Sequence, residues 1–443
     1  MRSRPTLVYA DAEGHIFDWP GMEMAGRSGH EFRRLQAGDW IPLPPGSELF
    51  LLPRRLPVGH DPHTKRFEIL SRDPRRPSRH VQAVAAFMAP AHTAVYSAAY
   101  HAERDAPLLP LFAYTAVGWH KDGFVAAGIR VDRDERQDLK NFDRARIERN
   151  ARRRMNRERD NRLIQHLGKC ALTYGCPAAR NLFMERWEAP LPTSPVCNAR
   201  CLGCISLQDR KDLRATQDRI TFVPTPEEIC GVAVPHLEQA PRPVVSFGQG
   251  CEGEPLLQAD TLAEAIRMMR AATPRGTINL NTNGSLPRMI PELCAAGLDS
   301  IRISLNSARS AYYQAYFNPQ GYRFDDVRQS ILAAKSAGRF VSINYFILPG
   351  FSDQPDELDA LCRLIEETRI DLIQMRNLNI DPEWYLSRIG APAGGRAIGI
   401  RQLMQRLGKR FPRLRFGYFN PSLDPTSNDG GNIVRTRPSR TPE

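Results

Sequence analysis

The sequence lacks the long apolar runs that carry a chain into or across a membrane. No stretch of about 18 or more apolar residues occurs, which argues against a transmembrane helix. The first residues, MRSRPTLVYADAEGH, lack the apolar core of roughly 7–15 residues that a secretory signal peptide needs. We therefore expect a cytoplasmic protein with no membrane partner.

The chain also lacks an even set of cysteines, since it has nine. An odd number does not suit a framework built from disulfides alone. In a reducing compartment, cysteines close together in sequence more often bind metal or take part in catalysis. Apolar residues make up 42% of the chain, so a well-buried core is expected.

Acidic residues are outnumbered, and much of the positive excess is concentrated in one run. The net charge is +12, and nine arginines lie between Arg144 and Arg162 against Glu148, Glu158 and Asp160. A solvated, arginine-rich helix face explains this run. Binding to RNA, DNA or an acidic partner is the alternative. The run has no interleaved aromatic residue and matches no nucleic-acid motif.

Composition divides the chain into four parts. Residues 1–131 contain short apolar pieces between Pro and Gly turns, which predicts a β-rich or mixed domain. Residues 132–180 predict a charged helical bridge, with one long polar helix over 132–172. Residues 181–419 alternate strand-like and helix-like runs. Residues 420–443 are expected to be a disordered tail.

The third part contains six β/α repeats, which favour a parallel sheet. The predicted strands cover 186–196, 243–250, 277–284, 300–307, 340–350 and 371–380. Six units describe an open barrel rather than a closed one of eight. The predicted fold class is therefore α/β, a partial (β/α)6 TIM-type barrel with an N-terminal β-rich or mixed domain.

The strongest chemical signal is PVCNARCLGC, which spaces Cys197, Cys201 and Cys204 as C-x3-C-x2-C. Three thiolates this close converge on one centre only if their loop wraps around it. Thiolates favour zinc, copper(I) or an iron–sulfur cluster. Structural zinc usually has four protein ligands, and no fourth ligand lies at a familiar spacing. Three ligands suit a cubane cluster with one open iron.

This spacing, on a loop after the first strand of a partial β/α barrel, resembles the radical S-adenosylmethionine (radical SAM) superfamily over roughly residues 185–385. The resemblance implies a 4Fe-4S cluster on the three cysteines, with the open iron chelated by S-adenosylmethionine (SAM). It further implies reductive cleavage of SAM to a 5′-deoxyadenosyl radical that abstracts hydrogen from a substrate. An electron donor similar to flavodoxin or ferredoxin is the implied partner.

The resemblance also identifies residues that would contact SAM, all near predicted strand ends. Such ends form the active site in β/α barrels. The GQGCEGEP string contains a Gly-Glu-Pro motif similar to that of the family, although Glu252 replaces a common first glycine. The implied SAM-binding residues are Gly253, Glu254, Pro255, Asn281, Asn283, Ser304, Asn306, Asn344 and Arg376.

Two features leave questions for the structure. Many family members carry an aromatic residue before the third cysteine, whereas this chain has Gly203, so we expect another segment, such as the N-terminal domain, to cover the cluster. Cys170 and Cys176 lie upstream of the motif, and Cys251 lies in the glycine-rich loop. We interpret these three as structural residues; the alternatives are an auxiliary cluster or metal for Cys170 and Cys176, and a substrate-facing thiol for Cys251.

The sequence does not identify a substrate, and two other functions remain open. One is a non-catalytic zinc or iron–sulfur scaffold. The other is a radical SAM enzyme that modifies RNA through the arginine-rich run.

Overall fold

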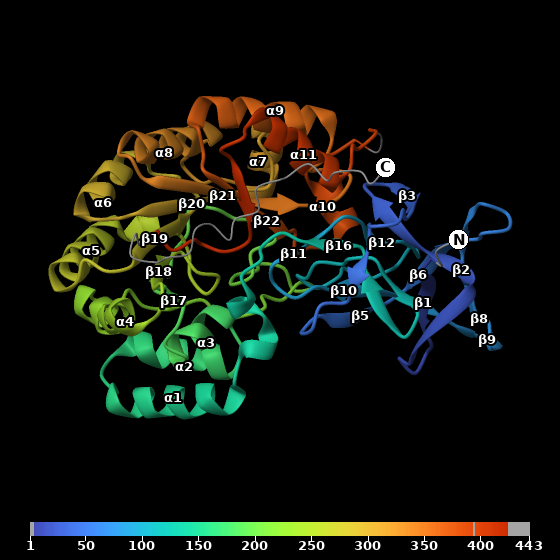
Figure 1. Ribbon diagram of the computed structural model, residues 1–443, viewed down its shortest axis with the longest axis horizontal. Helices are drawn as coiled ribbons and strands as arrows, with labels where there is room; N and C mark the ends of the chain where they lie inside the picture. The colour runs from blue at the N-terminus through green and yellow to red at the C-terminus, as the bar shows by residue number, and fades with distance from the viewer. Residues whose placement is uncertain (1–3, 393–394, 424–443) are drawn as a thin grey trace, which may run out of the picture.

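The computed structural model describes residues 4–392 and 395–423. Figure 1 shows a β-rich N-terminal region beside a curled sheet that is covered on its outer face by helices. Both parts of the predicted fold class are confirmed: an α/β half-barrel and an N-terminal β-rich domain. No helix among the described residues is long and apolar enough to cross a membrane.

The N-terminal region is built from short antiparallel strands, several of which begin in the apolar pieces noted in the sequence. Val8, Ala10, Val84, Ala86 and Val117 pack into one of its cores, because alternate side chains of each strand face the same side. Its strands are β1 (Thr6–Ala10), β2 (Ile16–Ser28), β3 (Glu31–Arg34), β4 (Ile41–Pro42), β5 (Glu48–Leu52), β6 (Arg55–His60), β7 (Phe67–Ile69), β8 (Arg72–Asp73), β9 (Arg76–His80), β10 (Gln82–Phe87), β11 (His92–Ala94), β12 (Ser97–Ala98), β13 (Tyr100–Ala102), β14 (Val117–His120), β15 (Gly123–Ala126) and β16 (Gly128–Arg130).

The segment after this region differs from the single long helix predicted over 132–172. Two 3-10 turns, η1 (Glu135–Gln137) and η2 (Leu139–Asn141), precede α1 (Arg144–Arg157), α2 (Arg162–Leu172) and α3 (Pro177–Phe183). The break arises at Asn161, whose side chain accepts the Ile164 amide and starts a new helix. The segment also packs on the barrel, since Arg162 pairs with Glu228 and α2 buries its apolar face.

The half-barrel is a seven-stranded parallel sheet in chain order. Its strands are β17 (Glu188–Pro190), β18 (Val244–Phe247), β19 (Thr277–Thr282), β20 (Ser300–Leu305), β21 (Phe340–Ile347), β22 (Leu372–Asn377) and β23 (Arg415–Gly417). Its helices are α4 (Pro226–Gln239), α5 (Ala259–Ala272), α6 (Ile290–Ala296), α7 (Ser310–Phe317), α8 (Phe324–Ser336), α9 (Pro355–Thr368), α10 (Pro382–Arg388) and α11 (Ile400–Arg410), with 3-10 turns η3 (Pro255–Gln258) and η4 (Pro287–Met289).

All six predicted strands exist, but the ends of the sheet differ from the prediction. β17 is much shorter than 186–196, because Pro190, Pro192 and Pro195 cannot donate to a ladder. The edge strand β23 was not predicted. The expected tail at 420–443 is wrong at its start: Asn420 is 1% exposed and hydrogen-bonded inside the barrel. Residues 424–443 lie outside the described part of the chain.

The N-terminal sheet docks on the carboxyl ends of β21 and β22. The Gly29 amide donates to the Pro349 carbonyl (2.9 Å), and the Thr93 hydroxyl donates to the Met375 carbonyl (2.6 Å). Arg55 Nη2 lies 2.7 Å from Asp381 Oδ2, and both side chains are 3% exposed. This ion pair fixes the two parts of the chain against each other.

We expect Asp381→Ala to lower the free energy of unfolding by about 3–5 kcal/mol, because it leaves the Arg55 charge buried without its partner. The substitution also removes the acceptor for the Glu383 and Trp384 amides at the start of α10. Urea unfolding followed by circular dichroism measures the change. Asp212→Ala, which removes the exposed ion pair with Arg210, is the control and should leave the unfolding midpoint in place. Equal midpoints for both variants would contradict the role of the buried pair.

Candidate cofactor site

The cysteine loop lies at the carboxyl ends of the barrel strands, after β17. Two neighbouring segments hold its backbone from opposite sides. On one side, the amides of Arg200 and Leu202 donate to the carbonyls of Phe317 (2.9 Å) and Tyr316 (3.0 Å) at the end of α7. On the other side, the Glu254 amide donates to the Val196 carbonyl (2.8 Å). The loop is therefore held between α7 and the glycine-rich loop, and a metal centre on its three cysteines stays a prediction.

The three thiols have different surroundings. Burial raises the pKa of Cys197 to about 11, with a smaller contribution from the charge of Glu254. Burial also raises the pKa of Cys201 well above its usual range. Arg219 Nη2 donates to Cys204 Sγ (3.4 Å), and this guanidinium is a positive group beside the loop. The thiols of Cys197 and Cys201 are therefore costly to ionise, and a cationic centre is what would make their thiolates stable.

The donor set fits a cluster better than a single zinc ion. Among the described residues, two triads of potential metal ligands have donor atoms within 4.8 Å of one another, and Cys197, Cys201 and Cys204 are not one of them. Ligands of one zinc ion must lie within about 4 Å of one another. Ligands of a 4Fe-4S cluster bind different irons and lie further apart, so the three cysteines fit that group.

Tyr316 of α7 lies against the position that Gly203 leaves without a side chain. A Cβ atom at position 203 would lie 2.8 Å from Tyr316 Oη. The Tyr316 ring is 4% exposed and packs edge-on against Tyr385 at 5.8 Å. Cover of the cluster by the N-terminal domain stays a prediction. An aromatic residue distant in sequence supplies the missing ring.

The Gly-Glu-Pro motif holds the cysteine loop in place. A Cβ atom at Gly253 would lie 1.9 Å from the Val196 carbonyl oxygen, so only glycine permits this close approach. Glu254 is buried and accepts hydrogen bonds from the amides of Leu256 and Asn283 and from the Thr282 hydroxyl. Burial raises its pKa to about 7. Pro255 begins η3 and starts the turn into α5.

Glu252, noted in the sequence only as a departure from the family pattern, has a clear structural task. Its carboxylate accepts the amides of Thr193 (2.7 Å), Ser194 (3.0 Å) and Gln249 (2.7 Å). Burial raises its pKa to about 7. The side chain thus joins its own loop to the segment that leads into Cys197.

The predicted asparagines of the third strand separate into two environments. Asn283 reaches the cysteine loop, since its Nδ2 donates to Asn198 Oδ1 (2.9 Å). Asn281 instead belongs to a hydrogen-bonded layer inside the barrel, where it donates to the Phe247 carbonyl and accepts from Asn279 and Asn420. Its contact with SAM stays a prediction, but its side chain is already occupied.

The next strands present polar atoms that have no protein partner. Ser304 pairs in register with Asn344 on the neighbouring strand, and both side chains are half-buried. Asn344 Oδ1 and Asn306 Oδ1 are buried without a hydrogen-bond partner. A buried, unpaired acceptor costs roughly 1–3 kcal/mol, so these atoms fit a site that hydrogen-bonds a polar ligand such as SAM. Arg376 is half-buried, with Cζ 4.1 Å from the centre of the Tyr418 ring.

A polar layer below these residues was largely missed from the sequence. Asn420 donates to Glu188 Oε1 (2.7 Å) and accepts from Gln374 (2.8 Å), whose own oxygen accepts from Arg302 (3.2 Å). Burial lowers the pKa of Arg302 to about 9. Charged residues inside apolar strands were the available signal for Glu188 and Arg302. Asn420 gave none, because it follows the last predicted element.

Comparison with known proteins agrees with this geometry. The model of the radical SAM superfamily matches residues 191–364. GTP 3',8-cyclase of Streptomyces coelicolor is 30% identical over 185 residues, which cover 38% of this chain and 53% of that protein. Molybdenum cofactor biosynthesis protein 1 of Drosophila melanogaster is 26% identical over 226 residues, which cover 49% of this chain and 35% of that protein. The chain thus spans about a third to a half of these relatives.

Among solved structures, SuiB of Streptococcus suis bound to its precursor peptide SuiA is 15% identical with a TM-score of 0.37. The similarity covers 58% of this chain and 53% of that one, and it is too distant to add to the argument. The matched residues contain the cysteine loop, the Gly-Glu-Pro loop and strands β18 to β21. Residues 191–364 of the chain therefore match the radical SAM superfamily in sequence.

Proposed function

We propose that this protein is an enzyme that cleaves SAM reductively and uses the resulting 5′-deoxyadenosyl radical to abstract hydrogen from a substrate. Radical SAM proteins bind a 4Fe-4S cluster and SAM. The observation that carries the proposal is the combination of three free thiols on the loop after β17 with the unpaired buried acceptors of Asn306, directly after β20, and Asn344 on the neighbouring strand β21. The bound cofactors would supply the electron and the radical.

In this proposal, the residues of the chain bind the cluster and SAM, orient them and keep water out of the site. Cys197, Cys201 and Cys204 would hold the cluster. Gly253, Glu254 and Pro255 shape the edge on which the methionine part of SAM would rest. Asn306 and Asn344 would hydrogen-bond SAM, with Ser304 beside them. Asn283 and Arg376 would complete the polar lining of the mouth.

The unpaired acceptors also favour an enzyme over a scaffold, because a scaffold has no use for a polar ligand at the mouth. The RNA alternative receives little support from α1 and α2. Arg152, Arg154 and Arg157 pair with glutamates of their own helix or its end, and Arg162 pairs with Glu228. Four of the nine arginines in this run therefore have acidic partners in the protein itself.

The proposal includes a partner and a compartment. Radical SAM enzymes need a reductant. We infer a flavodoxin-like or ferredoxin-like electron donor, acting in the cytoplasm. All nine cysteines are free thiols, as expected where thiols stay reduced.

We expect Cys201→Ala to abolish both cluster binding and 5′-deoxyadenosine formation, because it removes one of three iron ligands. After anaerobic reconstitution with iron and sulfide, the wild type should contain about four irons per chain and release 5′-deoxyadenosine on addition of dithionite and SAM. Cys294→Ala, in the interior of α6, is the control and should keep both properties. A folded wild-type protein that takes up no iron would refute the proposal.

Asn344→Leu should weaken SAM binding by about tenfold or more while leaving the SAM-free protein at least as stable as the wild type. The reason is that it removes an acceptor with no protein partner. Isothermal titration and urea unfolding measure the two quantities. Asn279→Leu is the matched contrast, because Asn279 accepts from Ser300 and donates to Ser246, so its loss should destabilise the fold. A destabilised Asn344→Leu with unchanged SAM affinity would contradict the assignment.

Gly203→Ala should shorten the lifetime of the cluster in air severalfold, because the new Cβ atom pushes the Tyr316 ring away from the loop. Removing Oη in Gly203→Ala/Tyr316→Phe should recover part of that lifetime. Loss of the cluster absorbance with time measures it. Gly123→Ala, which meets no atom within 4 Å, is the control. Equal lifetimes for Gly203→Ala and the control would show that Tyr316 is not a cover.

A further inference from the structure

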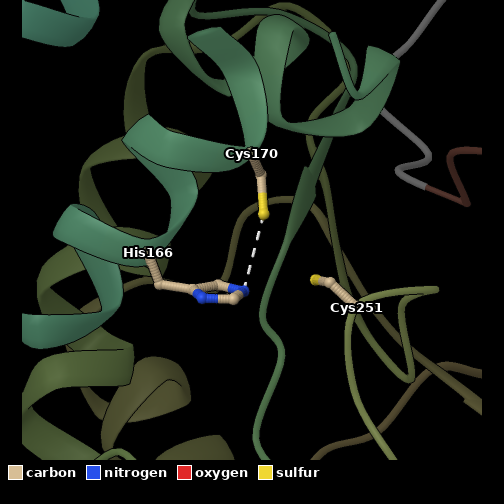
Figure 2. A group of neighbouring side chains, drawn as sticks. All are labelled: His166, Cys170 and Cys251. Carbon is tan, nitrogen blue, oxygen red and sulfur yellow. Dashed lines mark hydrogen bonds between the residues drawn. The ribbon is translucent and has the colours of Figure 1, made fainter. Parts of the chain in front are cut away.

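Three side chains outside the main cysteine motif meet beside the glycine-rich loop. They are His166 and Cys170 on α2, and Cys251 on the loop before Glu252 (Figure 2). The sequence suggested structural roles for Cys170 and Cys251, because Cys170 and Cys176 alone cannot complete a metal site and Cys251 suits a small residue in a tight turn. The structure brings them together with a histidine that the sequence did not single out.

The three side chains are arranged as the ligands of one metal ion would be. His166 and Cys170 are four residues apart on one helix, so both side chains lie on the same face. His166 Nε2 lies 3.5 Å from Cys170 Sγ, and Cys251 Sγ faces both from the opposite side (Figure 2). The three donor atoms all lie within 4.8 Å of one another. Cys170 and Cys251 are 2% and 4% exposed, and both are free thiols.

These distances suit one tetrahedral ion. Zinc bonds of about 2.3 Å to sulfur and about 2.0–2.1 Å to nitrogen place neighbouring S and N ligands about 3.6 Å apart. The observed distance of 3.5 Å between His166 Nε2 and Cys170 Sγ matches this ligand–ligand distance. A 4Fe-4S cluster does not fit, because its ligands bind different irons and must lie further apart. Two thiolates and an imidazole form a donor set typical of zinc.

We propose that His166, Cys170 and Cys251 bind one zinc ion. Binding releases the thiol protons of Cys170 and Cys251 to solvent, with a third proton released where Cys176 is the fourth ligand, and the neutral imidazole coordinates through Nε2. The fourth position belongs to water or to Cys176, which is near because its amide donates to the Cys170 carbonyl (3.1 Å). The proposal does not depend on radical chemistry at the other three cysteines.

The ion would fasten the glycine-rich loop from outside the barrel. Cys251 directly precedes Glu252, which holds Thr193 and Ser194 ahead of the cluster loop. The Cys251 carbonyl also accepts the Ile220 amide (2.8 Å). Zinc would therefore join α2 to the loop that shapes the SAM site, as a structural rather than a reacting metal.

The first test uses the full chain with Cys197, Cys201 and Cys204 all replaced by serine, so that the cluster site takes no metal. Circular dichroism checks that it is folded. After removal of metal under reducing conditions, Co²⁺ should bind at one per chain, with the visible bands of a tetrahedral ion and a thiolate charge-transfer band. Zn²⁺ should then displace it.

In this triple-serine protein, a further Cys170→Ser or Cys251→Ser substitution should reduce Co²⁺ affinity at least a hundredfold and lower the intensity of the thiolate charge-transfer band. Cys230→Ser is the matched control, because Cys230 lies on α4 outside the triad, and it should change neither. Cys176→Ser keeps the band if water is the fourth ligand and reduces it by about a third if Cys176 is. A folded protein that binds no Co²⁺, or a band that survives loss of both Cys170 and Cys251, overturns the proposal.

The second test needs no variant. X-ray absorption at the zinc edge of the wild-type protein, with its iron cluster loaded, should show two or three sulfurs at about 2.3 Å and nitrogen at about 2.0–2.1 Å. Iron does not contribute at this edge, so failure to form the cluster and failure to bind zinc are separate results. A zinc shell of oxygen and nitrogen alone overturns the proposal.

Discussion

Two buried carboxylates on one loop organise this end of the molecule. Glu252 and Glu254 are 5% and 3% exposed, and neither has an ion-pair partner within salt-bridge distance among the described residues. Backbone amides and a threonine hydroxyl satisfy them instead. Removing either carboxylate would leave several buried amides unpaired. That cost makes one arrangement of the loop strongly preferred.

The consequence is that separate parts of the site share one support. Glu252 fixes the segment before Cys197, while Glu254 fixes the end of β19 next to Asn283. Gly253 lets the two backbones approach closely enough for both contacts. The cluster ligands and the polar side chains at the strand ends are thus positioned by the same few atoms, and a shift in one is transmitted to the other.

The sequence predicted well those features that depend only on neighbouring residues, such as the buried strands. Runs such as those around Val244 and Ile301 are strands because their apolar side chains are buried on both faces of a parallel sheet, and the sequence shows this directly. The cysteine spacing is a local pattern of the same kind, and the cluster site that it indicates stays a prediction. Residues whose role depends on a distant partner were missed. Tyr316 covers Gly203, His166 meets Cys251, and Asn420 bonds to Glu188, and in each case the partner comes from a different element.

Two ion pairs hold the N-terminal sheet on the barrel, although apolar contacts there would cost less desolvation free energy. Arg55 meets Asp381, and Arg27 meets Glu383, at the start of α10. Desolvation offsets most of the attraction in such pairs, so their net contribution to stability is small. A directional ion pair does, however, exclude other orientations, because any slip leaves a buried charge unpaired. The sheet is therefore held in one position at the ends of β21 and β22, next to the strand that carries Asn344, and the surroundings of the mouth are fixed before any ligand binds.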